Sequence, residues 1–129
     1  MAYLDMKGPC TLTKDEIQKV IRKKTPGNFA LGYVDEHNIF VVQYIGRADE
    51  DLRVELYKWV GNGYRDFKFS MTNNHKFAFL KECKNYHEFG ESNKLKNSIH
   101  PKRKAGSDWL CPICDIYNKV EQEIEMEKV

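Results

Sequence analysis

A cluster of cysteine and histidine residues near the C-terminus constrains this chain more than any other feature of its sequence. Cys83 and His87 stand four positions apart, so a helix would present both side chains on one face. Cys111 and Cys114 form a Cys-x2-Cys turn, and His100 lies between these two pairs. Structural zinc sites are tetrahedral and take four cysteine or histidine ligands. The spacing therefore predicts a closed structural zinc site that ties the C-terminal segment to the preceding helix.

Five residues compete for the four ligand positions of this site. Cys111 and Cys114 are the first choice, because one tight turn presents both sulfurs. Cys83 is the next choice, since the remaining cysteine lies far away near the N-terminus. His87 takes the fourth position because it shares a helical face with Cys83, and His100, which precedes a proline, is the alternate to His87.

The composition indicates one domain of ordinary size. The chain has 129 residues, of which 41% are apolar, and a net charge of +2, so no global field favours nucleic acid or membrane. It contains no secretory leader pattern and no run near the ~18 apolar residues of a membrane span. We expect a cytoplasmic protein, monomeric by default, whose cysteines bind metal instead of forming disulfides.

Hydrophobic periodicity and turn signals predict a small α/β fold, with a three-stranded antiparallel sheet flanked by helices. The expected elements are, in chain order, a helix in residues 13–24, strands at 29–34 and 39–45, a helix in 49–60, a strand at 64–69, a helix over 74–89, a lysine-rich exposed loop over 90–106, and a last helix with Ile116, Val120 and Ile124. The single domain would comprise an N-terminal helix (1–25), a core (26–97) and a zinc-binding extension with the terminal helix (98–129).

The predicted hairpin carries two short motifs. Residues 26–31 read Pro-Gly-Asn-Phe-Ala-Leu, and residues 44–46 read Tyr-Ile-Gly. They resemble the two opening motifs of the GIY-YIG nuclease family, and the second motif is matched letter for letter. The expected order of two strands, a helix, a strand and a helix is also similar to that family. The resemblance covers residues 26–97, with residues 98–129 as an added zinc-binding extension.

This resemblance implies a chemistry and a set of site residues. Members of the family hydrolyse DNA phosphodiester bonds with one divalent cation, usually magnesium, held by a helical glutamate. The matching residue is Glu82, whose hard oxygen ligands suit Mg²⁺. The resemblance also implies that Tyr44 helps to activate the attacking water and that Asn97 helps to shape the site. DNA is then the expected partner, and the lysine-rich loop would meet its backbone.

Two positions depart from the family pattern. The first-motif tyrosine is Phe29 here, and Tyr33 would replace it only through a change of register. The position that matches the family's catalytic arginine is Glu55, and Arg53 would face another side of that helix. Arg47, directly after the Tyr-Ile-Gly motif, is therefore the expected substitute, able to pair with a phosphate oxygen.

Three hypotheses about function follow. The first is a metal-dependent endonuclease with a structural zinc site. The second is a catalytically inactive zinc-binding module of the same fold that binds nucleic acid or a protein partner. The third, which the sequence favours least, is a zinc-ribbon-like adaptor in which the Tyr-Ile-Gly motif is accidental.

Overall fold

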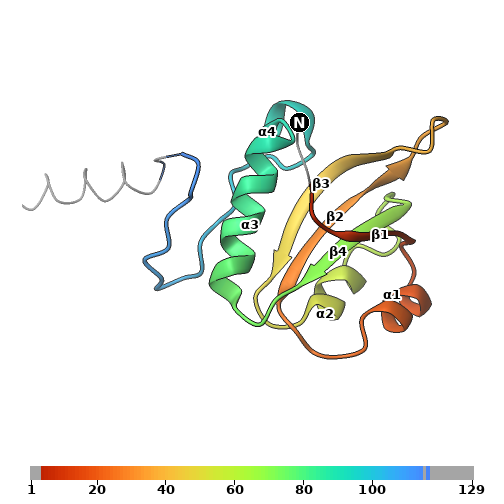
Figure 1. The fold of residues 1–129 in the computed structure, drawn as a ribbon, viewed down its shortest axis with the longest axis horizontal. Helices are drawn as coiled ribbons and strands as arrows, with labels where there is room; N and C mark the ends of the chain where they lie inside the picture. The colour runs from red at the N-terminus through yellow and green to blue at the C-terminus, as the bar shows by residue number, and fades with distance from the viewer. Residues whose placement is uncertain (1–3, 115, 117–129) are drawn as a thin grey trace, which may run out of the picture.

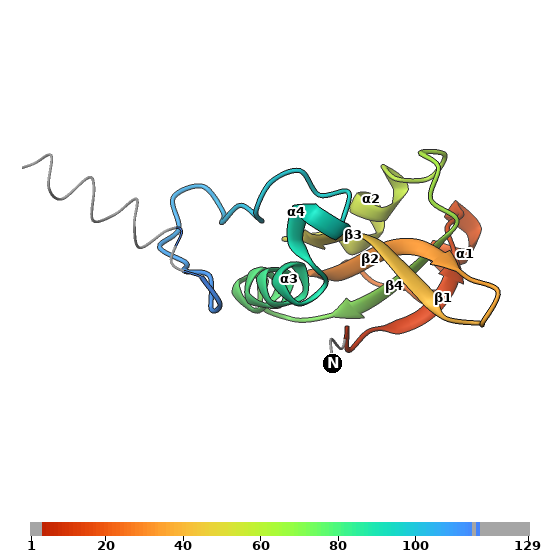
Figure 2. The same cartoon turned by 90° about the horizontal axis from the view of Figure 1, so that it is seen from above.

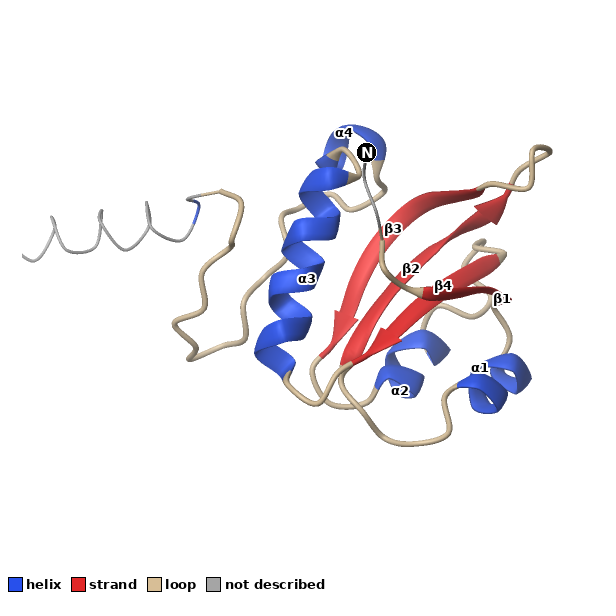
Figure 3. Ribbon diagram, viewed as in Figure 1, coloured by secondary structure: helices blue, strands red, loops and turns tan. Residues whose placement is uncertain are grey.

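A four-stranded antiparallel sheet, with helices on both faces, forms the body of the computed structural model, which describes residues 4–114 and residue 116 (Figure 1). The elements are β1 (Lys7–Thr11), α1 (Lys14–Val20), β2 (Gly27–Val34), β3 (Phe40–Ala48), α2 (Leu52–Tyr57), β4 (Asp66–Met71), α3 (His75–Glu88) and α4 (Glu91–Lys94). The strand order is β1-β4-β2-β3, which makes β3 one edge of the sheet (Figure 3).

The predicted hairpin is confirmed as β2 and β3. The two strands pair antiparallel, with Phe29 opposite Gly46 and Leu31 opposite Tyr44. Gln43 is the extra residue of a β-bulge, because the pairing resumes with Gly32 opposite Val42. A Cβ atom at Gly46 would lie only 2.3 Å from Cζ of Phe29, so the glycine lets this buried ring lie directly against β3.

The expectation of a three-stranded sheet is wrong, because β1 adds a fourth strand. It pairs antiparallel with β4, with Lys7 opposite Phe69 and Cys10 opposite Phe67. It lies in the segment for which only a helix was expected. Its run Lys-Gly-Pro-Cys-Thr has weak strand propensity, and most of its residues are exposed, so no apolar alternation marks it in the sequence.

Two apolar layers cover opposite faces of the sheet, and Figure 2 shows α2 and α3 on its two sides. Ile17 of α1 and Leu52 and Leu56 of α2 pack on Phe29 and its neighbours on one face. On the other face, Tyr86 of α3 packs on Ala30 and Ile45 with Leu95. The alternation of β2 between these layers follows from the period of two of a strand. α3 is thereby held along β3 at the edge of the sheet.

The chain after α4 is tied to the outer edge of β3. The backbone N–H of Lys96 donates to the carbonyl of Gln43 at 2.6 Å. The side-chain amide of Asn97 bonds to the N–H and the C=O of Ile45, at 2.9 and 2.7 Å. Because β3 is an edge strand, Asn97 completes hydrogen bonding that a further strand would otherwise supply.

The predicted lysine-rich loop is interrupted by α4 and is irregular beyond it. Of the predicted last helix, only Ile116 belongs to the described residues, and Val120 and Ile124 lie outside them. Within the described part of the chain, no helix has the length and apolar character needed to cross a bilayer.

Candidate functional site

A His/Cys cluster of four side chains forms where the end of α3 meets the C-terminal segment. Its members are His87, His100, Cys111 and Cys114, whose ligand atoms all lie within 4.8 Å of one another. The two Nε2 atoms are 3.1 Å apart, and each lies 3.4 Å from a sulfur: His87 from Cys111, and His100 from Cys114. Zn–N bonds of about 2.0 Å and Zn–S bonds of about 2.3 Å in a tetrahedron place ligand atoms about 3.3 to 3.8 Å apart. The cluster is therefore compatible with a zinc site.

The outer nitrogens of both imidazoles have acceptors, which determines where the ring protons lie. His100 Nδ1 is 2.8 Å from the carbonyl oxygen of Pro101, and His87 Nδ1 contacts the carboxylate of Glu91. Both acceptors require a proton on Nδ1, so in the neutral imidazoles each Nε2 carries a lone pair. Two lone pairs that face each other at 3.1 Å repel unless a cation lies between them. Such outer acceptors are the partners that orient metal-binding histidines.

Local structure explains how these ligands come together. Asn74 caps α3 by accepting hydrogen bonds from the backbone N–H groups of Lys76 and Phe77. At the other end of α3, Gly90 adopts φ 100°, so the chain turns and Glu91 lies beside His87. The ring of Trp109 packs 5.6 Å from that of Phe79 in a buried cluster that also contains Cys111. This packing holds the Cys-x2-Cys turn against α3.

Cys83 lies beside the His/Cys cluster but is not one of its four members. It is fully buried with Phe79, Trp109 and Cys111. Burial first, and then Cys111, raises the pKa of the Cys83 thiol. The ligand set expected from the sequence thus differs by one residue, because His100 stands where Cys83 was expected. His87, Cys111 and Cys114 lie together as predicted.

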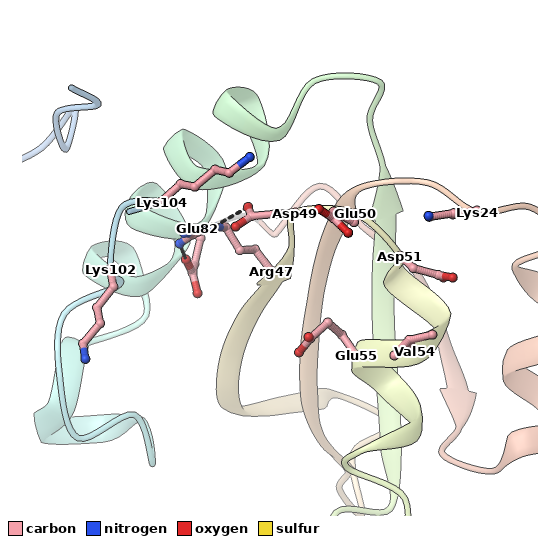
Figure 4. Close-up of a pocket in the computed structure, with 10 residues that line it drawn as sticks. All are labelled: Lys24, Arg47, Asp49, Glu50, Asp51, Val54, Glu55, Glu82, Lys102 and Lys104. Carbon is pink, nitrogen blue, oxygen red and sulfur yellow. Dashed lines mark hydrogen bonds and ion pairs between the residues drawn. The ribbon is translucent and has the colours of Figure 1, made fainter. Parts of the chain in front are cut away.

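The second candidate site centres on Glu82, five positions before His87 on α3. Glu82 is buried, and its Oε1 lies 2.5 Å from Nη1 of Arg47 on β3. Nε of the same arginine lies 2.9 Å from Asp49, and its guanidinium stacks 5.1 Å from the ring centre of Phe79. Figure 4 shows Arg47 between the two carboxylates. Arg47 is therefore held on three sides.

Arg47 and Glu82 line the larger cleft of the site, with a volume of about 690 Å³. Its other lining residues are Lys24, Asp49, Glu50, Asp51, Val54, Glu55, Lys102 and Lys104. Burial raises the pKa of Glu82 to about 7, although the Arg47 guanidinium acts in the opposite direction. Burial alone would lower the pKa of Arg47, but Glu82 and Asp49 outweigh it and raise this pKa. The pair is thus an arginine cation beside a carboxyl group that titrates near neutrality.

Tyr44 approaches Glu82 from a smaller pocket of about 300 Å³. Its ring, half-buried, packs 4.5 Å from that of Trp59. Burial, followed by Glu82, raises the pKa of the Tyr44 hydroxyl. Because Tyr44 and Arg47 are three positions apart on one strand, they point to opposite faces of β3. Glu82 lines both cavities, whereas Arg47 lines only the larger and Tyr44 only the smaller.

The other residues named from the sequence, Asn97, Phe29 and Glu55, lie in three different parts of the structure. Asn97 lines the smaller pocket, but its amide is used to bind the backbone of Ile45. Phe29 is buried beneath Gly46, while Glu55 lines the larger cleft and pairs with Lys58 at 2.9 Å. Three residues that shape the two sites were not predicted from the sequence: Asp49, Glu91 and Trp109. Glu91 alone had a signal, because it follows His87 by four positions.

Comparisons with protein-family models, with curated proteins and with solved structures found no match to this chain. A fold of this size supports many functions, so the fold alone does not identify one. The function is therefore inferred from the chemistry of the His/Cys cluster and of the two cavities that meet at Glu82.

Proposed function

We propose that this chain is a GIY-YIG-like endonuclease domain that hydrolyses DNA phosphodiester bonds with Mg²⁺ at Glu82, as a cytoplasmic monomer. One observation carries the proposal: a buried helical carboxylate and an arginine meet in an open cleft with Lys102 and Lys104 on its rim, next to the pocket of Tyr44. Phosphodiester hydrolysis uses a metal-binding carboxylate, a cation for the phosphate and a group that orients water, and Glu82 lines both the cleft of Arg47 and the pocket of Tyr44.

Each residue has a role that its surroundings support. Glu82 supplies the hard oxygen ligand, and bound Mg²⁺ would neutralise charge that develops on the phosphate. Arg47 leaves Glu82 for a phosphate oxygen, for which its planar guanidinium is suited. Tyr44 orients water from the other side of Glu82, and Lys102 and Lys104 attract the DNA backbone.

The order of elements also supports the proposal. From the first motif onward, the chain runs β2, β3, α2, β4 and α3, which is the order that the resemblance implies. Tyr44 and Gly46 of the second motif lie on β3, beside the helix that carries Glu82. Asn97 holds the following segment against this strand, which agrees with a role in shaping the site.

The proposed zinc ion has a structural role in this account. His87, His100, Cys111 and Cys114 would fill all four tetrahedral positions, which would leave no position for water or substrate. His100 lies only two positions before Lys102, and Asn97 binds β3 three positions before His100. Zinc would therefore fix the lysine-bearing segment beside the larger cleft.

The Arg47–Glu82 ion pair favours one alternative function. It occupies the carboxylate that the metal needs, and Glu55 places a negative charge where the family has an arginine. A domain with these properties would bind nucleic acid or a protein partner without cleaving it. The second candidate is therefore an inactive, zinc-stabilised binding module.

A cleavage assay separates the two functions. Zinc-loaded protein is incubated with single-stranded, duplex and branched DNA in the presence of Mg²⁺ or Mn²⁺. We expect cleavage that Glu82→Gln lowers by about 10³-fold, because the metal supplies several kcal/mol of transition-state stabilisation. Glu88→Gln, an exposed residue at the end of the same helix, is the matched control and should cleave normally. Binding without cleavage supports the second function, and cleavage that survives Glu82→Gln contradicts the first.

A further inference from the structure

The two cavities that meet at Glu82 also share Lys102 but differ in chemistry. Charged side chains of both signs line most of the larger cleft: Arg47 and three lysines are basic, and five residues are acidic, Asp49, Glu50, Asp51, Glu55 and Glu82. The smaller pocket combines the ring of Tyr44 with Ile99 and Pro101, and has Lys96 and Ser98 at its edge. A ligand that spans both cavities could place an anionic group against Arg47, Lys102 and Lys104 and a flat apolar part in the smaller pocket.

Ile99 is the least expected residue of the smaller pocket. Its side chain is 58% exposed, although it lies between two residues whose side chains are tied down, Asn97 and His100. Those two anchors fix the short stretch between them, so Ile99 is held in the open on the pocket wall. The ring of Tyr44, which also lines this pocket, packs with its centre 4.5 Å from that of Trp59. The smaller pocket thus has two fixed apolar surfaces that are accessible to a ligand.

A nucleotide has the two parts that these cavities would accept. Its phosphate suits Arg47, Lys102 and Lys104, while its base suits the tyrosine ring and the isoleucine. A base within a duplex is stacked on both sides and cannot lie against a protein ring. Only an unpaired nucleotide can therefore occupy both cavities at once.

We infer that the smaller pocket binds an unpaired nucleobase, while the adjoining phosphate lies in the larger cleft. This inference rests on the proposed nucleic-acid function and makes single-stranded DNA, or an unpaired region of branched DNA, the ligand. Lys96 adds a positive charge at the same pocket, where its Nζ lies 5.5 Å from the ring centre of Tyr64.

Fluorescence anisotropy with three labelled DNAs of equal length tests the inference: a single strand, the corresponding duplex, and an abasic strand that keeps the phosphates but lacks bases. The zinc-loaded protein, without Mg²⁺, should bind the single strand about 5- to 100-fold more tightly than the abasic strand, the usual contribution of stacking one base. It should also prefer the single strand to the duplex. Equal affinity for the single strand and the abasic strand would overturn the inference.

Two matched variants test whether the smaller pocket produces the preference for the single strand. Ile99→Ser should remove most of the preference for the single strand over the abasic strand, whereas Ile39→Ser should preserve it. Ile39 is the control because it is 59% exposed and lies beside the hairpin turn, away from both cavities. If Ile99→Ser keeps the full preference, the base is bound elsewhere and the inference is wrong. Selective binding without cleavage would leave this inference standing and contradict only the hydrolysis proposal.

Discussion

The His/Cys cluster and the Glu82 site share α3, on which His87 follows Glu82 by five positions, yet the two sites differ in how complete they are. In the cluster, four donors already face one point, and both histidines have outer partners that orient them. At Glu82, the carboxylate already has a cation, which is Arg47. The cluster can accept a metal as it stands, whereas the Glu82 site must exchange one cation for another.

This difference separates the consequences of substitution in the two regions. Loss of a cluster residue removes one of the four ligands, so the affinity for zinc and the attachment of the segment that it holds should fall together. A substitution near Glu82 instead alters the ionisation of its carboxyl group, which depends on burial, on Arg47 and on bound metal. Substitutions in the cluster should therefore cause a nearly all-or-none loss of zinc, whereas substitutions near Glu82 should have graded effects.

The largest expected effect is that of Cys111→Ala. The variant should lose bound zinc and, with it, about 4 kcal/mol of stability when free zinc is 1,000-fold above its Kd. Elemental analysis and thermal unfolding provide the two measurements. Cys10→Ala is the control, because Cys10 lies on β1, outside the cluster, and its substitution should leave the zinc content unchanged. A zinc content in Cys111→Ala equal to that of the control would exclude Cys111 as a ligand.

Arg47→Ala should have opposite effects on two properties. Removal of the competing cation should raise the affinity of Glu82 for Mn²⁺ when measured at pH 8, where the carboxyl group is ionised. Cleavage should nevertheless fall by about 10²-fold, because a phosphate ligand is lost. Titration calorimetry and the cleavage assay measure these quantities, with Arg53→Ala as the control. Weaker binding of Mn²⁺ by Arg47→Ala would show that Arg47 supports the metal instead of competing with it.

Asn97→Ala should destabilise the segment between the two sites. It removes two buried hydrogen bonds and leaves the N–H and C=O of Ile45 without these partners, at a cost of about 2 kcal/mol. The control is Asn93→Ala, an exposed position on α4. Urea unfolding of both zinc-loaded proteins gives the difference. If the two variants are equally stable, Asn97 does not tie the segment to β3.

The smallest expected effect is a dependence of cleavage on pH. The pKa of Glu82 is raised to about 7 by burial, so the carboxyl group is neutral below this pH and ionised above it. Only the ionised form binds metal, and the rate should therefore rise about tenfold between pH 6 and pH 8. Rates measured at saturating and at subsaturating Mg²⁺ separate a loss of metal binding from a loss of chemistry. A flat profile would show that Glu82 stays ionised throughout this range.

Local patterns explain the parts of the molecule that were predictable from sequence. The hairpin was recognisable because apolar runs flank a polar turn, and the apolar stripe of α3 indicated that helix. The strand β1 was not recognisable, since it contains Gly8 and Pro9 and is exposed at the sheet edge. Such a strand is stabilised by its pairing with β4 and not by its own residues.

The two sites show a similar limit. Helical spacing correctly placed Cys83 and His87 on α3, but it cannot show that Phe79 and Trp109 enclose Cys83 while His100 reaches the cluster. Likewise, Arg47 and Glu82 are 35 positions apart, and only the packing of α3 on β3 brings them into contact. Spacing within one element predicts which residues share a face. It does not predict which distant residue covers that face.

The most direct test of the account is X-ray absorption at the zinc edge of the zinc-loaded protein. The account predicts two sulfur ligands at about 2.3 Å and two nitrogen ligands at about 2.0 Å, from Cys111, Cys114, His87 and His100. Cys83→Ala should give the same spectrum, because Cys83 lies beside the cluster and not within it. Three sulfur ligands and one nitrogen in the wild-type protein, reduced to two sulfurs in Cys83→Ala, would contradict the account.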